Sequence, residues 1–221
     1  MKLRMVPARQ GAVWVKMGVR TFVKQPLALT GLFFLFMAAM SVLSLVPVLG
    51  SVVALALLPA ATLGLMAATQ EATKGKFPMP TVLVSAFRAG RQQLRGMLVL
   101  GGLYALGFLV VMGLSALVDG GQFARLYLVG GELSADLLMQ SDFEAAAMVA
   151  MALYLPLSLL FWHAPALVHW HGISPVKSLF FSLVACVRNF WAFTVFGLTW
   201  MAAFLGMGLV VAIISALLGS P

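Results

Sequence analysis

Long apolar runs alternate along this chain with short basic segments. Five of the runs are about 20 residues or longer, the length at which a helix crosses roughly 30 Å of hydrocarbon. The pattern therefore predicts an all-α fold, a polytopic transmembrane helical bundle that forms a single integral membrane domain over residues 1–221. The predicted spans are residues 27–46, 51–69, 97–118, 142–162 and 191–218.

Three basic segments that precede apolar spans have the pattern of amphipathic helices. They cover residues 11–24, 80–95 and 175–189, and in each the basic and apolar side chains fall on different faces. Such helices suit the boundary between lipid tails and water, where Lys and Arg face anionic headgroups. The predicted lipid-facing bases are Lys16, Arg20, Lys24, Arg88, Arg91, Arg95, Lys177 and Arg188.

These helices and the spans that follow them form a repeat. Residues 53–59 resemble residues 149–156, and each stretch ends on a proline, Pro59 or Pro156. The repeated unit is an amphipathic helix followed by a transmembrane hairpin, and the third unit lacks its return span. We expect that either this hairpin was lost or the chain is cut short.

Two local patterns refine the predicted bundle. Ala56, Ala60, Gly64 and Ala68 form a stripe of small residues that lets a neighbouring helix approach closely, which predicts a central position for residues 51–69. The loop over residues 119–141 is acidic, and Ser141 with Glu144 has the spacing of a capping box at the start of the fourth span.

Composition supports a membrane protein and indicates its orientation. Hydrophobic residues make up 62% of the 221 residues, charged residues 9%, and the mean hydropathy is +1.06. The net charge of +8 is spread through short loops, so no nucleic-acid partner is predicted. All 14 Lys and Arg residues except Arg125 fall on one side of the predicted spans. By the positive-inside rule that side, with the N-terminus, is cytoplasmic.

One stretch resembles a known family. Residues 164–168, a short turn, and then Ser182 to Arg188-Asn189-Phe190 are similar to the signature of uncharacterised multi-pass inner-membrane proteins of Gram-negative bacteria. The resemblance covers the whole chain loosely and implies an inner-membrane protein of the bacterial cell. Members of that family resemble six-span proteins with both termini inside, so five spans here are a departure. The resemblance implies no activity for any residue.

Metal and cofactor chemistry is not predicted. His163, His169 and His171 lie close together, but on a helix His169 and His171 would point about 200° apart, and no Cys, Asp or Glu is near in sequence. An anchoring role beside interfacial aromatic residues fits them better. The methionines are scattered through apolar spans, which suits packing rather than copper binding. We therefore expect no metal and no cofactor.

Function is predicted only in outline. No nucleophile with a base and no phosphate-binding glycine loop is found, so we expect no enzyme. The leading hypothesis is a non-enzymatic inner-membrane component that interacts with lipids or with a partner, either a second copy or another membrane protein. The alternative is a transporter of small molecules or lipids with a ligand cavity at Pro59 and Pro156, which would break corresponding spans. Ionisable residues are absent from the middle of the spans, which disfavours ion-coupled transport.

Overall fold

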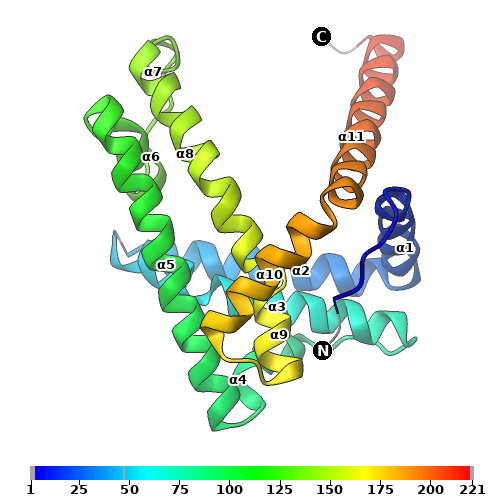
Figure 1. Ribbon diagram of the computed structural model, residues 1–221. Coiled ribbons are helices and arrows are strands. Elements are labelled where there is room, and N and C mark those ends of the chain that lie inside the picture. Colours follow the sequence, from blue (N-terminus) through cyan, green and yellow to red (C-terminus); the bar gives the residue numbers. More distant parts are fainter. Residues whose placement is uncertain (1–2, 47, 220–221) are drawn as a thin grey trace. The chain divides into compact units, whose positions relative to one another are not determined.

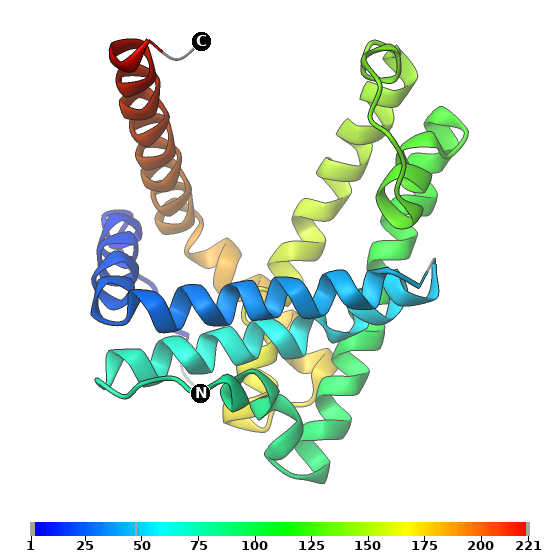
Figure 2. The same ribbon diagram turned by 180° about the vertical axis from the view of Figure 1, so that it is seen from behind.

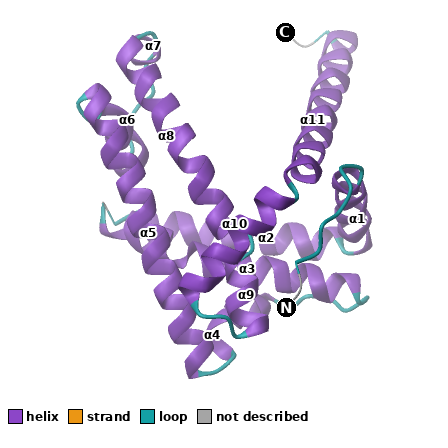
Figure 3. Ribbon diagram, in the orientation of Figure 1, coloured by secondary structure: helices purple, strands orange, loops and turns teal. Residues whose placement is uncertain are grey.

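The structure is a computed structural model that describes residues 3–46 and 48–219. Within these residues every regular element is a helix (Figure 3). Five segments are long and apolar enough to cross a membrane: α2, α3, α5, α8 with the α9 that follows it, and α11. This confirms the all-α polytopic architecture. The long helices are α2 (Pro26–Ser44), α3 (Leu49–Thr73), α5 (Arg91–Asp119), α8 (Ser141–Phe161) and α11 (Phe190–Leu218).

Shorter helices connect the long ones, and the chain divides into two compact units. The smaller unit combines the N-terminal segment through Lys24 with the residues from Val184 onward, and the larger unit is Gln25–Leu183. The shorter elements are α1 (Gln10–Lys24), the 3-10 helix η1 (Pro80–Val84), α4 (Ser85–Arg88), α6 (Gln122–Val129), α7 (Ala135–Leu138), α9 (Ala164–His171) and α10 (Pro175–Arg188).

Helix α5 is the centre of the larger unit. It packs against both α3 and α8: Figure 1 shows α8 beside it and α3 crossing behind it, and Figure 2 shows α2 running beside α3. Of the most apolar part of α5, 44% of residues are buried, against 28% for α3. The sequence placed residues 51–69 near the centre of the bundle, and α3 does pack against α2, η1, α4 and α9 as well as α5, although α5 is the more buried of the two.

The predicted stripe of small residues on α3 does bring neighbours close. A Cβ at Gly101 of α5 would overlap the carbonyl oxygen of Ala56, and a Cβ at Gly64 would lie 2.6 Å from the carbonyl oxygen of Leu83 in η1. Ala60 and Ala68 are also buried. The stripe therefore faces two different elements, α5 near its start and η1 near its end.

An aromatic cluster joins α5 to α8. The hydroxyl groups of Tyr104 and Tyr154 are 3.1 Å apart, so one donates to the other. The ring of Tyr104 meets Phe161 edge-on at 5.0 Å, and Phe108 meets Tyr154 edge-on at 6.1 Å. Pairing the two hydroxyls matters because an unpaired hydroxyl in an apolar interior is costly.

In the smaller unit, α1 packs against the first turns of α11. The ring of Trp14 lies 5.5 Å from Phe193, Val15 is buried, and Gly11 allows the backbone of α11 to approach. The predicted amphipathic helix therefore forms, but α11 covers part of its apolar face. Beyond residue 200, almost every residue of α11 is exposed.

Asn189 ties the N-terminal segment to the start of α11. Its Oδ1 accepts a hydrogen bond from the backbone N–H of Val6 at 2.9 Å. Its Nδ2 donates to the carbonyl oxygens of Arg4 at 3.2 Å and Ala185 at 3.0 Å. Asn189 is also the residue between α10 and α11, so one buried amide holds three chain segments together.

The second predicted amphipathic helix, residues 80–95, is wrong as a single element. The chain forms η1 and α4 and then breaks at Ala89 and Gly90, where Gly90 has φ +112°. Arg91 and Arg95 instead belong to the first two turns of α5. Glycine tolerates this left-handed conformation at little cost, whereas it weakens a helix interior.

Two details around the acidic loop also differ from the prediction. The capping box is wrong: Gln140 is the N-cap of α8, and the Ser141 hydroxyl donates to Asp142 instead. Asp119 acts as a cap for the unpredicted helix α6, because its two carboxylate oxygens accept from the N–H groups of Gly121 at 2.8 Å and Phe123 at 2.6 Å. A side-chain oxygen can satisfy first-turn N–H groups in this way.

Candidate functional site

The eight bases singled out in the sequence are all exposed, but only some are brought together. Arg91 and Arg95 border one cavity and Arg88 borders another. The remaining bases, Lys16, Arg20, Lys24, Lys177 and Arg188, line neither cavity. The candidate functional sites are therefore these two basic cavities in the larger unit.

We call the first cavity the α5–α10 pocket. It has a volume of about 480 Å³ and lies between the start of α5 and the turn that joins α9 to α10. Its lining contains two arginines and no carboxylate. The lining residues are Arg91, Gln92, Gln93, Arg95, Gly96 and Val99 of α5, with Val168, Gly172, Ile173, Ser174 and Pro175.

Two glycines allow the walls of the α5–α10 pocket to meet. A Cβ at Gly96 would lie 2.9 Å from a methyl group of Val168, so glycine lets α9 approach α5 here. Gly172 ends α9 with φ +64°, and the N–H of Ile173 donates to the carbonyl oxygen of Leu167 at 3.2 Å. A left-handed glycine at the end of a helix, with a bond from the next residue back to the last turn, turns the chain sharply, here toward α10.

Ser182 holds α10 against the junction of α8 and α9. Its hydroxyl accepts from the backbone N–H of His163 at 2.9 Å and donates to the carbonyl oxygen of Leu159 at 2.8 Å. The side chain is fully buried. Because these bonds anchor α10 about two turns beyond Pro175, they also fix where the first turn of α10 meets the pocket.

The electrostatics of the α5–α10 pocket favour an anion. The first turns of α5 and α10 both border it, and the N-terminus of a helix carries a partial positive charge. Gly90, the N-cap of α5, has no side chain to cap the first N–H groups, and α5 has no acidic residue in its first turn. Two arginines and two helix N-termini therefore converge on one cavity, an arrangement suited to phosphate.

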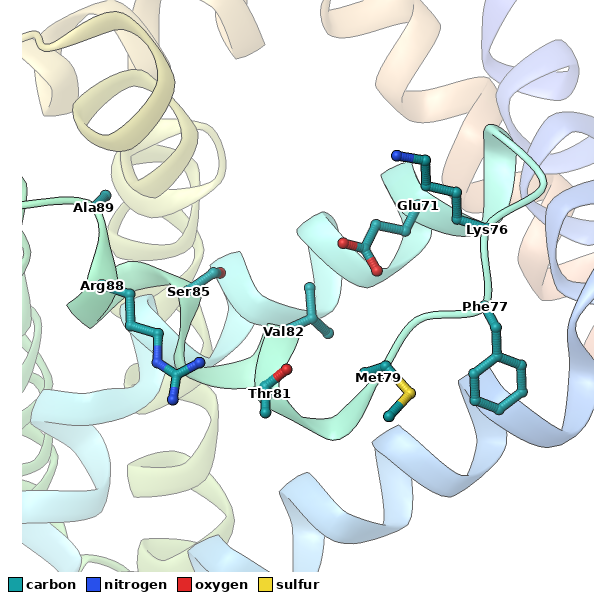
Figure 4. Close-up of a pocket in the computed structure, with 9 residues that line it drawn as sticks. All are labelled: Glu71, Lys76, Phe77, Met79, Thr81, Val82, Ser85, Arg88 and Ala89. Atoms are coloured by element: carbon teal, nitrogen blue, oxygen red, sulfur yellow. The ribbon is translucent and has the colours of Figure 1, made fainter.

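The second cavity, the α3–α4 pocket, has a volume of about 540 Å³. Figure 4 shows Glu71 and Lys76 toward one end of it, Arg88 and Ser85 toward the other, and Thr81 and Val82 between them. It is formed by the end of α3, the connection to η1, and α4. Unlike the α5–α10 pocket, it contains a carboxylate as well as bases.

The two prolines of the predicted ligand cavity lie in different environments. Helices α3 and α8 continue without interruption through Pro59 and Pro156. Pro59 is buried and Pro156 is exposed, and neither borders the α5–α10 or the α3–α4 pocket. A transporter that uses these prolines stays a prediction. The two helices, however, are not interrupted at Pro59 and Pro156, as that hypothesis supposed.

The histidines occupy three different environments. His163 precedes α9 and His171 ends it, while the Nδ1 atom of His169 is buried without a hydrogen-bond partner. Within residues 3–46 and 48–219, no three His, Cys, Asp or Glu side chains gather as ligands for one metal ion. The predicted absence of a bound metal stays a prediction.

Sequence reasoning missed several residues of the two cavities. Gln92, Gln93 and residues 172–175 were not predicted to line a cavity, and neither was Glu71. The step of four between Arg91 and Arg95 was visible in the sequence. No pattern, however, linked them to a turn almost 80 positions away, because that contact depends on Gly96 and on the C-cap at Gly172.

The fold and the apolar helices define an integral membrane protein of the multi-pass α-helical class. The chain is 43% identical over 223 residues to a probable inner membrane protein of Burkholderia thailandensis, and the match covers 100% of this chain and 83% of that protein. The chain belongs to the same family of inner-membrane proteins, which confirms the resemblance noted from the sequence. No family model matches it. No solved structure matches it either.

Proposed function

We propose that this protein is a non-enzymatic inner-membrane component that binds anionic phospholipid headgroups in the α5–α10 pocket. The observation that carries the proposal is the convergence of Arg91, Arg95 and the first turns of α5 and α10 on one cavity without a carboxylate. Basic pockets between helices on the cytoplasmic side are a recognised form of headgroup site.

The composition of the lining supports a lipid rather than a small soluble anion. The lining contains the arginines, the two glutamines and Ser174 together with apolar Val99, Val168 and Ile173. A phospholipid suits both kinds of residue, because its phosphate seeks charged donors and its acyl chains avoid water. A free anion would gain nothing from the apolar residues.

The proposal includes the orientation of the chain. The N-terminus and the bases of both pockets would lie in the cytoplasm, and the acidic loop between α5 and α8 would lie in the periplasm. The support is the distribution of Lys and Arg, of which only Arg125 falls on the acidic side. A pocket on the cytoplasmic side would meet an anionic leaflet.

Thermal unfolding of the purified protein in a neutral detergent tests the headgroup site. Phosphatidylglycerol should raise the unfolding temperature more than phosphatidylcholine does. The double variant Arg91→Gln/Arg95→Gln should weaken phosphatidylglycerol binding about 30-fold, because each base near an anionic surface is worth about 1 kcal/mol.

The matched control is Lys16→Gln/Arg20→Gln, which removes the same charge from α1 and touches neither pocket. It should leave the effect of phosphatidylglycerol within about twofold. Equal losses in the two double variants would show that net charge alone attracts the lipid, and the assignment to the α5–α10 pocket would be wrong.

A further inference from the structure

The α3–α4 pocket differs from the α5–α10 pocket in its charge pattern. Glu71 is the only acidic residue on the basic side of the predicted topology, and it borders this cavity together with Lys76 and Arg88. Within the described residues, no ion pair joins Glu71 to either base. The cavity therefore presents separate negative and positive groups rather than a neutralised pair.

A second observation points to a ligand. The Oγ atom of Ser85 is buried and has no hydrogen-bond partner, and Ser85 borders the same cavity. A buried hydroxyl without a partner costs free energy, so native proteins generally pair such groups. Figure 4 shows Ser85 and Arg88 at the same end of the cavity, so a phosphate bound at that end would lie near both residues.

The apolar part of the lining indicates the source of that ligand. Val82 is buried in the floor, while Phe77 and Met79 beside it are more than half exposed, at 59% and 58%. Large exposed apolar side chains next to a charged cavity suit the boundary between headgroups and acyl chains.

We propose that the α3–α4 pocket binds a headgroup that carries both a phosphate and a primary ammonium, with Arg88 and Ser85 on the phosphate and Glu71 on the ammonium. An ethanolamine phospholipid has this chemistry, and a soluble phosphoethanolamine compound shares it. A choline headgroup offers no N–H to Glu71, so the pocket should discriminate against it. The inference uses residues distinct from those of the α5–α10 pocket.

The test compares three ligands on the full-length protein in neutral detergent by titration calorimetry. They are phosphatidylethanolamine, phosphatidylcholine with the same acyl chains, and soluble glycerophosphoethanolamine. The parent protein should prefer phosphatidylethanolamine over phosphatidylcholine by about tenfold, because a hydrogen bond to a charged group is worth about that factor. Tighter binding of the lipid than of the soluble compound assigns the site to a membrane lipid, and equal binding assigns the same chemistry to a soluble ligand.

Three variants locate the site. Glu71→Gln keeps the shape and should abolish the tenfold preference, whereas Glu132→Gln, an exposed acid in the loop before α7, should leave it unchanged. Ser85→Ala should lower affinity several-fold without destabilising the ligand-free protein, since the hydroxyl has no protein partner. Equal affinity of the parent for the two lipids, or an identical effect of Glu71→Gln and Glu132→Gln, would overturn the inference. Phosphatidylglycerol stabilisation should survive Glu71→Gln, so failure here is distinguishable from failure at the α5–α10 pocket.

Discussion

Single glycines decide how closely the helices of the larger unit pack. Gly101 and Gly102 are neighbours on α5, yet only Gly101 faces α3, where a side chain would collide with the backbone of Ala56. Gly102 is exposed with nothing within 4 Å of an added Cβ. The pair offers a matched test of the α3–α5 interface.

We predict that Gly101→Ala destabilises the protein by about 2 kcal/mol or more, in the range of overpacking substitutions, because the backbones must separate. Gly102→Ala should be neutral or stabilising by up to about 1 kcal/mol, since alanine is the better helix former. Thermal unfolding in detergent measures both. Similar behaviour of the two variants would mean that α3 does not cross α5 at this point.

Asn189 is the second residue on which local structure depends. We predict that Asn189→Ala frees the N-terminal segment, because the N–H of Val6 and the carbonyl oxygen of Arg4 both lose their amide partner. The loss should reach about 1–3 kcal/mol in stability. Limited trypsin digestion should then cleave after Arg4 and Arg9 faster than in the parent.

The isosteric variant Asn189→Asp separates the two halves of this contact. It keeps an acceptor for Val6 and removes both N–H donors, so its cleavage rate should fall between those of the parent and Asn189→Ala. A parent-like rate for Asn189→Ala would show that the amide does not hold the segment.

At the scale of elements, the apolar spans could be predicted because their signal is local. A run such as residues 27–46 has no charge and must be helical in hydrocarbon, since every backbone polar group there needs an internal partner. The helix α10 could be predicted for a similar reason, as Pro175 opens it and its apolar residues recur at helical spacing.

The break at Gly90 could not be predicted from the spacing of the residues. Arg88, Arg91 and Arg95 continue a helical pattern across it, yet the chain leaves the helical region at φ +112° and starts α5 anew. A glycine inside an amphipathic pattern fits a weakened helix or a boundary, and only the packing of α4 against α3 decides between them. That packing also forms the α3–α4 pocket, whereas the α5–α10 pocket depends on Gly96 and on the C-cap at Gly172. Both depend on contacts between segments distant in sequence, which explains why their linings were missed.

Of the five long helices that the structure describes, α11 has the least buried apolar part. Its first turns pack against α1, but none of its most apolar part is buried. In a bilayer that surface contacts acyl chains or another protein. A partner for it, whether a second copy or a different membrane protein, remains the prediction made from the sequence.

For the whole molecule, the proposed orientation rests on the division of basic residues. We predict that reporter fusions after Gln70, Lys76 and Ser174 behave as cytoplasmic, and that fusions within residues 121–134 behave as periplasmic. Paired alkaline phosphatase and fluorescent-protein fusions in a Gram-negative host provide the measurement. The reverse behaviour at any one of these sites would contradict the proposed orientation.

The two pockets of the molecule have related linings. Both lie at the ends of long helices, both contain arginine, and they differ in the presence of Glu71. The different headgroups that we propose for them rest on that one carboxylate. A protein with two such sites would sense or organise headgroups of different charge beside each other.

Native mass spectrometry of the protein released from a defined lipid mixture tests the central claim most directly. With equal amounts of phosphatidylglycerol and phosphatidylcholine, the parent and the control Lys16→Gln/Arg20→Gln should retain phosphatidylglycerol preferentially, and Arg91→Gln/Arg95→Gln should lose that preference. Equal retention of the two lipids by the parent, or undiminished phosphatidylglycerol retention by Arg91→Gln/Arg95→Gln, would contradict an anionic headgroup site in the α5–α10 pocket.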